Sequence, residues 1–421
     1  MKAGFAKVQL NIKNEIRLTG FSDSRFTKSI LDGIFAKAVI LESKKKVKIL
    51  FLTLDLLFIG KKLSEILQDN IYKLFGIPIE NIILTATHTH SAPKTCEQFL
   101  DNIKINNVFF NEVIEKSCKA VKLALKYNSC VKAELYETQD YPAINRRLPV
   151  PWLLKLYPSY IQKKRCLNRP NRKTDSDKSC RAIKFIFKNK SYFWVLNAAA
   201  HATNYNGNKV SSDYPYYIEK NLISLSPRQL CKGSLFLQGW AGDQNCDSIK
   251  NINLSLNPIS IFEKLLIKQT FNRSASKENL NSIGKKIAKS IIHAKKKETL
   301  NFNNFSIKSK KIILSLEDSQ NINLHLKYFN LGRVKIFSLN GEVFASYRKR
   351  LINILNNVPS RCIFTLGYTE DPVGYIPDSK ALSLGGYETD RSIKYFGLSS
   401  RFSKSIEQKI ILGLTSIINN I

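Results

Sequence analysis

Short apolar runs alternate with helical patterns along the whole chain, and this alternation restricts the fold more than any other feature. A mixed β-sheet with helices on its faces is the arrangement that such an order predicts. The runs at 182–188 and 191–200, separated by Asn189 and Lys190, predict a hairpin. The predicted strands are 35–42, 48–57, 81–88, 182–188, 191–200, 234–242, 334–342 and 362–368, and the predicted helices are 61–76, 106–127, 279–297 and 401–420.

The 421 residues contain no internal repeat and no long linker rich in proline or serine. We therefore expect one α/β domain over residues 1–421, with mixed β-sheets flanked by helices. The longest apolar run, at 47–60, is interrupted by Lys48 and Asp55 and is shorter than the roughly 18 residues of a membrane span. The N-terminal residues lack the apolar segment and cleavage site of a signal peptide, so we expect a cytoplasmic location.

A formal net charge of +33 raises the question of an anionic partner such as nucleic acid or a membrane. Lysine, asparagine and isoleucine recur throughout, which favours a compositional bias with lysines on solvated faces. The most basic stretch, 162–181, has no interleaved aromatic residues for stacking on bases, so we do not expect nucleic acid as a partner. Peripheral contact with an anionic membrane, or a basic loop beside a site for an anionic substrate, stays open. The oligomeric state is unknown at this stage.

Two of the five histidines, His88 and His90, lie one residue apart where a predicted strand ends. Side chains at positions i and i+2 of a strand point the same way, so both rings could share a metal. Alternatively, one binds a metal and the other faces the substrate, or both are solvated at a polar strand end. His201 also follows a strand, where active sites of α/β proteins gather, although a core histidine fits that position equally. We expect His293 and His325 to lie on the surface.

Glu342 is the last residue of the predicted strand at 334–342 and directly follows a glycine. Because buried strands rarely end in an unpaired glutamate, this carboxylate needs a partner. That partner is either a metal site or one of the many lysines. The segment 367–390 is rich in tyrosine and glycine and is typical of a loop with close backbone approaches. The eight cysteines form no Cys-x-x-Cys pair, which argues against a cysteine zinc site.

Together, these segments resemble the neutral/alkaline ceramidase family and its wider bacterial relatives. ATHTHSAP (86–93) is similar to the family's THTHSGP, and LQGWAGDQN (237–245) to its Q-G-x-A-G-D-x-N. Similar stretches lie near the N-terminus and in later motifs, in the family's order and over nearly the whole chain. They are AGFAKVQLNI (3–12), ILDGIFAKAVILE (30–42), NAAAHATNYNGNKVSSDYPYYIE (197–219), SLNGEVF (338–344) and GYIPDSKALSLGGYE (374–388).

The resemblance implies a zinc hydrolase with the fold of the family's N-terminal catalytic domain, without its C-terminal β-sandwich domain. The family's roles fall on residues in these motifs and in AINRRLP (143–149). The implied zinc ligands are His88, His201, Glu342 and Tyr375. The implied catalytic residues are His90, Arg146, Tyr387 and, where the family's ceramidases have a serine, Asn245.

The chain also departs from the family pattern. Asn245 removes any mechanism that needs a serine at that position, and Ala92 and Lys94 replace glycines of the histidine motif. These changes bear on ceramide as the substrate more than on the metal site. We expect a metal-activated water to attack the amide of a small-molecule or lipid N-acyl substrate, with His90 and Tyr387 stabilising the oxyanion and Arg146 anchoring the substrate.

Asp243 and Asn245 are expected to orient neighbouring groups or the turn. One alternative is a zinc deacetylase or esterase for a sugar or another polar acylated substrate, which would use the same ligands. A second is a non-enzymatic basic protein that binds nucleic acid or anionic lipid through its charge.

Overall fold

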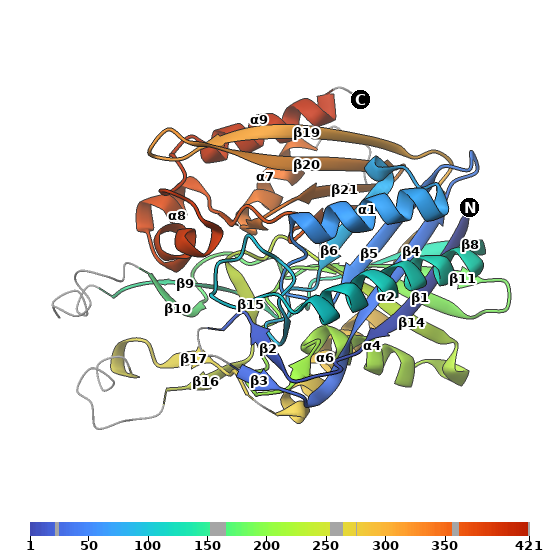
Figure 1. The fold of residues 1–421 in the computed structure, drawn as a ribbon, viewed down its shortest axis with the longest axis horizontal. Coiled ribbons are helices and arrows are strands. Elements are labelled where there is room, and N and C mark those ends of the chain that lie inside the picture. Colours follow the sequence, from blue (N-terminus) through green and yellow to red (C-terminus); the bar gives the residue numbers. More distant parts are fainter. Residues whose placement is uncertain (22–24, 152–165, 253–263, 275, 356–361, 420–421) are drawn as a thin grey trace.

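The computed structural model describes residues 1–21, 25–151, 166–252, 264–274, 276–355 and 362–419. In this part of the chain, two β-sheets pack face to face and helices cover the outer surface of each (Figure 1). Most pairs of neighbouring strands are antiparallel, but several are parallel, among them β5 (Lys48–Leu54) with β6 (Ile82–Ala86) and β12 (Tyr192–Ala198) with β14 (Cys231–Gln238). The α/β class with mixed sheets that the sequence predicts is therefore confirmed.

The larger sheet has ten strands in the described part of the chain, eight of them along one continuous path. Outside its main path, β13 (Val210–Ser211) pairs with β4 (Ile30–Glu42), and β18 (Lys296–Leu300) pairs with β8 (Ser129–Thr138). The order along that path is β14 (Cys231–Gln238), β12 (Tyr192–Ala198), β11 (Cys180–Phe187), β8 (Ser129–Thr138), β1 (Lys2–Leu10), β4 (Ile30–Glu42), β5 (Lys48–Leu54) and β6 (Ile82–Ala86).

The sequence of β5 shows how this sheet is buried on both faces. Successive side chains of a strand point to opposite faces. Leu50 and Leu52 pack into the core beneath the helices, whereas Ile49 and Phe51 pack into the core shared with the second sheet. Because both faces are covered, the strand reads as a continuous apolar run rather than as an alternating pattern.

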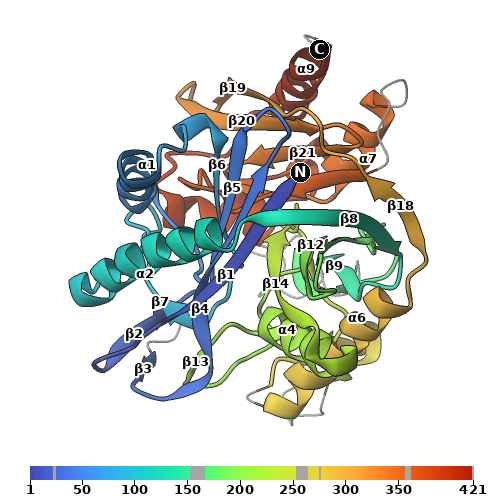
Figure 2. The ribbon, with the colours of Figure 1, turned by 90° about the vertical axis from the view of Figure 1, so that its right-hand side faces the viewer.

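Two pairs of helices cover the outer face of the larger sheet (Figure 2). α1 (Lys61–Phe75) and α2 (Asn107–Lys126) cover one half, and α4 (Tyr214–Ser224) and α6 (Lys277–His293) cover the other. α1 ends at Gly76, whose left-handed backbone suits glycine. α2 begins after Asn106, whose side chain accepts a hydrogen bond from the backbone N–H of Phe109.

The second sheet lies against the inner face of the first and is covered by α7 (Ser346–Ile354) and α9 (Ile406–Asn419). Its strand order is β19 (Ser306–Ser315), β20 (Asn321–Leu331), β21 (Val334–Leu339) and β23 (Cys362–Leu366). α8 (Ser379–Leu384) belongs to the same core. The smaller sheets are β10 (Cys166–Asn171) with β9 (Ala143–Pro149) and β15 (Gln244–Cys246), β3 (Arg25–Thr27) with β2 (Ile16–Thr19) and β7 (Ala92–Pro93), β16 (Ile249–Asn251) with β17 (Gln269–Phe271), and β22 (Glu342–Val343) with β24 (Tyr375–Ile376).

Most predicted elements are present, and the predicted hairpin is β11 with β12. The helix predicted at 279–297 is wrong beyond His293, because the chain becomes extended at Ala294 and pairs with the edge of β8 as β18. The tail helix begins at Ile406 rather than at residue 401, and residue 420 lies outside the described part. Of the basic stretch 162–181, residues 162–165 also lie outside it. His293 and His325 are exposed, as predicted.

No helix in the described ranges is both long and apolar enough to span a membrane.

Candidate metal centre

The four side chains predicted to bind zinc lie at the ends or starts of strands from both layers. His88 follows β6 and His201 follows β12, whereas Glu342 begins β22 just after β21. Tyr375 begins β24, which runs parallel to β22 and pairs Tyr375 with Glu342. All four residues are buried. The fold therefore gathers residues from distant parts of the sequence into one interior region.

The backbone at His88 differs from the sequence prediction. β6 already ends at Ala86, and His88 has a left-handed backbone with φ of 63°. Such a conformation costs a non-glycine residue of order 1 kcal/mol or more and is concentrated at functional sites. The prediction that His88 and His90 share one face of a strand is wrong, because the chain turns at His88. Their rings nevertheless meet edge to face, with centroids 4.8 Å apart.

The donor atoms of His88, His90, His201 and Glu342 converge. Nε2 of His201 lies 3.0 Å from Oε2 of Glu342, and Nε2 of His88 lies 3.4 Å from the same oxygen. Nε2 of His90 lies 3.3 Å from Nε2 of His88, and one ring nitrogen from each of the three histidines lies within 4.8 Å of the others. His90, to which the family resemblance assigns a catalytic role, thus also offers a donor atom to this cluster, as in the alternative in which both rings share a metal.

The tautomers of the three histidines fit a cation. Nδ1 of His88 lies 3.0 Å from the carbonyl oxygen of Leu57, and Nδ1 of His90 lies 2.7 Å from that of Gly20. A carbonyl only accepts hydrogen bonds, so each Nδ1 carries the proton and each Nε2 is left with a lone pair. His201 is held in the same way by the carbonyl oxygen of Ala241, at 2.9 Å. The Nε2 atoms of His88 and His90 therefore face each other with no proton between them, an arrangement that a bound cation would relieve.

Burial keeps the imidazole of His201 neutral, as metal ligation requires. Desolvation lowers the pKa of His201 to about 3, because the buried ring cannot hold a charge without water. Burial alone would raise the pKa of Glu342, but the neighbouring His88 and His201 lower it below its usual range. Imidazole nitrogens beside an ionised carboxylate are a donor set that zinc prefers.

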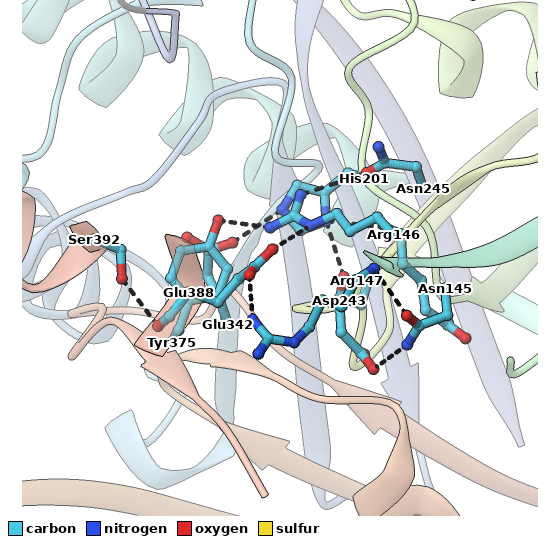
Figure 3. Close-up of polar contacts among 12 residues, drawn as sticks. Asn145, Arg146, Arg147, His201, Asp243, Asn245, Glu342, Tyr375, Glu388 and Ser392 are labelled. Carbon is cyan, nitrogen blue, oxygen red and sulfur yellow. Dashed lines mark hydrogen bonds and ion pairs between the residues drawn. The ribbon is translucent and has the colours of Figure 1, made fainter. Parts of the chain in front are cut away.

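Arg146 of β9 is fully engaged by neighbouring side chains (Figure 3). Its Nη2 donates to the hydroxyl oxygen of Tyr375 over 3.0 Å, and its Nε donates to Glu388 over 2.9 Å. Its Nη1 lies 3.4 Å from the side-chain oxygen of Asn245. Desolvation raises the pKa of Tyr375 well above its usual value, which Arg146 partly opposes. The contacts indicate that Arg146 positions Tyr375 rather than standing free.

Glu388 is a site residue to which the sequence assigned no role. It accepts hydrogen bonds from both Arg146 and Arg147, and all three side chains are buried. Arg147 also donates to the carbonyl oxygen of Gly385 over 2.7 Å. Glu388 is the glutamate of the GGYE motif, so the residue itself was visible in the sequence. A carboxylate in a glycine-rich segment does not, however, reveal two arginine partners that are distant in sequence.

Two aromatic side chains form a wall beside His88 and were also not predicted. The ring of Tyr368 lies 4.2 Å from the imidazole of His88, and the ring of Phe58 lies 5.0 Å from it. The hydroxyl of Tyr368 is buried without a hydrogen-bond partner in the described part of the chain. These rings exclude water from one side of the cluster.

Asp243 and Asn245 of the GDQN turn contact residues close to the cluster. Asp243 accepts hydrogen bonds from Asn145 over 2.8 Å and from the backbone N–H of Ala345 over 2.9 Å, which ties β9 to the segment after Glu342. Asn245 forms an isolated bridge with His201. Its side-chain nitrogen is buried with no partner among the described residues.

A cavity of about 400 Å³ opens beside the cluster. His90, Arg146, Tyr375 and Tyr387 line its inner end, so three of the four predicted catalytic residues reach it. The ring of Tyr387 lies 5.9 Å from that of Tyr375. The cavity is within the size range of small-molecule sites. Its other walls are formed by Gly20, Phe21, Phe99, Leu100, Asp101, Asn102, Asn168, Thr203, Arg273, Lys394 and Tyr395.

Solved structures of ceramidases have the same fold as this chain. The crystal structure of neutral ceramidase from Pseudomonas aeruginosa superposes with a TM-score of 0.74 at 14% sequence identity, over 100% of this chain and 75% of that chain. A structure of a ceramidase complexed with C2 superposes with a TM-score of 0.73 at 14% identity and the same coverage.

Neither a protein-family model nor a curated protein sequence matches the chain. The likeness is therefore carried by the three-dimensional arrangement. At 14% sequence identity, this likeness establishes the fold and nothing beyond it. The chain has the fold of neutral ceramidase.

Proposed function

We propose that this chain is a zinc-dependent hydrolase that cleaves the amide bond of an N-acylated substrate. The observation that carries the proposal is the convergence of two unprotonated imidazole nitrogens, from His88 and His201, on one oxygen of Glu342. Two imidazoles and a carboxylate are the donor set of many hydrolytic zinc sites. The ceramidase fold supports the same reaction class.

His88, His201, Glu342 and Tyr375 would hold the ion. When bound, zinc supplies a Lewis acid and a water that ionises near neutral pH. Arg146 contributes positive charge beside the hydroxyl of Tyr375 and thereby favours the tyrosinate form that a ligand requires. The aromatic wall of Tyr368 and Phe58 keeps the region dry, which strengthens each of these electrostatic interactions.

His90 is suited to moving a proton. Its Nδ1 proton is held by the carbonyl oxygen of Gly20, so its Nε2 can accept a proton but has none to donate at first. Having accepted one, the same Nε2 can deliver it to the leaving amine. We therefore propose His90 as the proton carrier and not as the first donor to the substrate oxygen.

Tyr387 is suited to stabilising the negative charge that develops on the substrate carbonyl oxygen. It lines the same cavity as His90, and burial raises the pKa of its hydroxyl above the usual value. The hydroxyl therefore keeps its proton and can donate a hydrogen bond throughout the reaction. Arg146, which the sequence suggested as a substrate anchor, is proposed instead to hold Tyr375 in place.

A second candidate function is hydrolysis of a small polar acylated compound, such as an N-acetyl sugar or an ester. The cavity of about 400 Å³ has polar groups such as Asn168 and Thr203 in its wall, which favours this candidate over a long-chain lipid. A panel of N-acyl amines, N-acetyl sugars and esters separates the two candidates by the bond that is cleaved.

The metal site is tested by elemental analysis of the purified protein. We expect about one zinc per chain, lost in His201→Ala and retained in His293→Ala, whose histidine is exposed on α6. A chelator should abolish amine release, and added zinc should restore it. Zinc content unchanged by His201→Ala, or amide hydrolysis that survives chelation, would overturn the proposal.

A further inference from the structure

The cavity wall carries more positive charge than its neighbours neutralise. The charged side chains that line it are Arg146, Arg273, Lys394 and Asp101. Arg146 is paired with Glu388. Asp101 is paired with Lys94 at 2.8 Å, so it does not neutralise the other cations. Among the residues that the structure describes, no carboxylate forms an ion pair with Arg273 or Lys394.

Arg273 is the more unusual of these two cations. Its Nε is buried and has no hydrogen-bond partner in the described ranges. Desolvation, together with the positive charges of Arg146 and Arg169, lowers its pKa to about 10. A guanidinium presents its donors in a planar fork that matches carboxylate and phosphate oxygens. Leaving such a group without a partner costs free energy, which a bound anion would recover.

The backbone holds Arg273 in place beside the candidate site. The N–H of Asn272 donates to the carbonyl oxygen of Ser248 over 2.7 Å, and that of Ser274 donates to the carbonyl oxygen of Asn204 over 2.9 Å. Hydrogen bonds on both sides of Arg273 therefore fix its position. They make Arg273 part of the wall of the cavity rather than of a free surface loop.

The ring of Phe21 lies between Arg273 and His90 in the wall of the cavity. The guanidinium carbon of Arg273 lies 6.0 Å from the centroid of the Phe21 ring, and the same ring lies 5.2 Å from that of His90. One aromatic side chain thus contacts both the cation and the proposed proton carrier. A small substrate can reach from one to the other within the cavity.

We propose that Arg273, assisted by Lys394, binds an oxyanion of the substrate, so that the preferred substrates are small N-acyl compounds with a carboxylate or a phosphate. This rests on the proposed amide hydrolysis and adds the substrate class. Arg273 is a specificity residue in this scheme and takes no part in bond cleavage. Asn168 and Thr203, which line the same cavity, can donate further hydrogen bonds to the anion.

Three compounds with the same hexanoyl group test the proposal: N-hexanoylglycine, N-hexanoylethanolamine and its phosphate monoester. They carry a carboxylate, no charge and a phosphate. Steady-state kinetics on the zinc-loaded protein should show KM at least about tenfold lower for an anionic compound than for the neutral one. Whichever anion is preferred identifies the source of the oxyanion. Equal KM values for all three compounds would overturn the proposal.

The variant Arg273→Gln should remove that preference by raising KM for the anionic compound about tenfold, with kcat and the kinetics of the neutral compound unchanged. Lys394→Gln should have a smaller effect in the same direction. Arg228→Gln is the matched control, because it removes an arginine from an exposed turn outside the cavity. An equal loss for neutral and anionic compounds in Arg273→Gln would mean a structural role and would overturn the proposal.

Calorimetric binding of the same compounds separates this inference from the proposed function. If none of the amides were cleaved, the hydrolase proposal would fail. Tighter binding of an anionic compound to wild type than to Arg273→Gln would still establish the anion subsite. Cleavage of all three compounds without any dependence on Arg273 would support the hydrolase and overturn the subsite.

Discussion

The guanidinium of Arg146 donates a hydrogen bond from Nη2 to the hydroxyl oxygen of Tyr375 over 3.0 Å. A lysine at this position would keep the charge but lose the fork that also reaches Glu388 and Asn245. We expect Arg146→Lys to lower kcat/KM roughly 10- to 100-fold, the usual effect of disturbing a group that orients a ligand. Steady-state assays measure this. Arg350→Lys, which disturbs an ion pair with Glu407 away from the cavity, should leave activity unchanged. Full activity in Arg146→Lys would contradict the assigned role.

Glu388 neutralises two buried arginines, Arg146 and Arg147. Removing its charge leaves two cations in the interior, so Glu388→Gln should lower the free energy of unfolding by about 3 to 5 kcal/mol. Urea denaturation followed by circular dichroism measures the loss. Glu407→Gln breaks a pair with Arg350 that is partly exposed and should cost less than about 1 kcal/mol. Similar losses of unfolding free energy in the two variants would contradict the prediction that burial makes the Glu388 ion pairs more important for stability.

Tyr387 is predicted to act through its hydroxyl alone. Tyr387→Phe keeps the ring but removes the proposed donor to the substrate oxygen, so kcat should fall about 10²- to 10³-fold with zinc content unchanged. Tyr395→Phe removes a hydroxyl from the same cavity and serves as the control, with an expected change of less than about twofold. If Tyr387→Phe kept its kcat, another group would have to supply the hydrogen bond.

Asp32 should make stability depend on pH. Burial raises the pKa of its carboxyl to about 7, although the hydroxyl of Ser211 and the N–H of Ser212 donate hydrogen bonds to it. The pKa of Asp32 is higher in the folded than in the unfolded chain. Its contribution to the free energy of unfolding is therefore fully present below about pH 4 and is lost as the pH rises through about 7. Asp32→Asn should therefore gain stability relative to wild type between about pH 5 and pH 8. Urea denaturation at both values tests this, with the exposed Asp69→Asn as a control that shows no such trend.

The sequence predicted the buried strands well, because strands covered on both faces read as continuous apolar runs. It did not predict β19, in which Lys310 and Lys311 are exposed, or β20, in which exposed polar residues such as Asn323 alternate with partly or fully buried apolar ones. The helix predicted at 279–297 also included Lys296 and Lys297, which belong to β18 instead. In these segments tertiary pairing overrides the local pattern.

The candidate site was predicted from motifs, whereas its geometry was not. The pairing of Glu342 with Tyr375 joins two strands that are distant in sequence, and no local pattern encodes such a register. The rings of His88 and His90 were expected to meet because they would point to the same face of a strand. They meet instead because the backbone turns at His88, where it has a left-handed conformation. The sequence predicted no role for Arg273, because one arginine among many basic residues cannot be told apart from the others until its surroundings are known.

The candidate ligands belong to both layers of the sandwich, since His88 and His201 follow strands of one sheet and Glu342 follows a strand of the other. An ion gripped by all three would cross-link the layers at the edge where their strands end. Such a cross-link would make the thermal stability of the fold, as well as the proposed activity, depend on the ion, because removing the ion would also remove the link between the sheets at that edge.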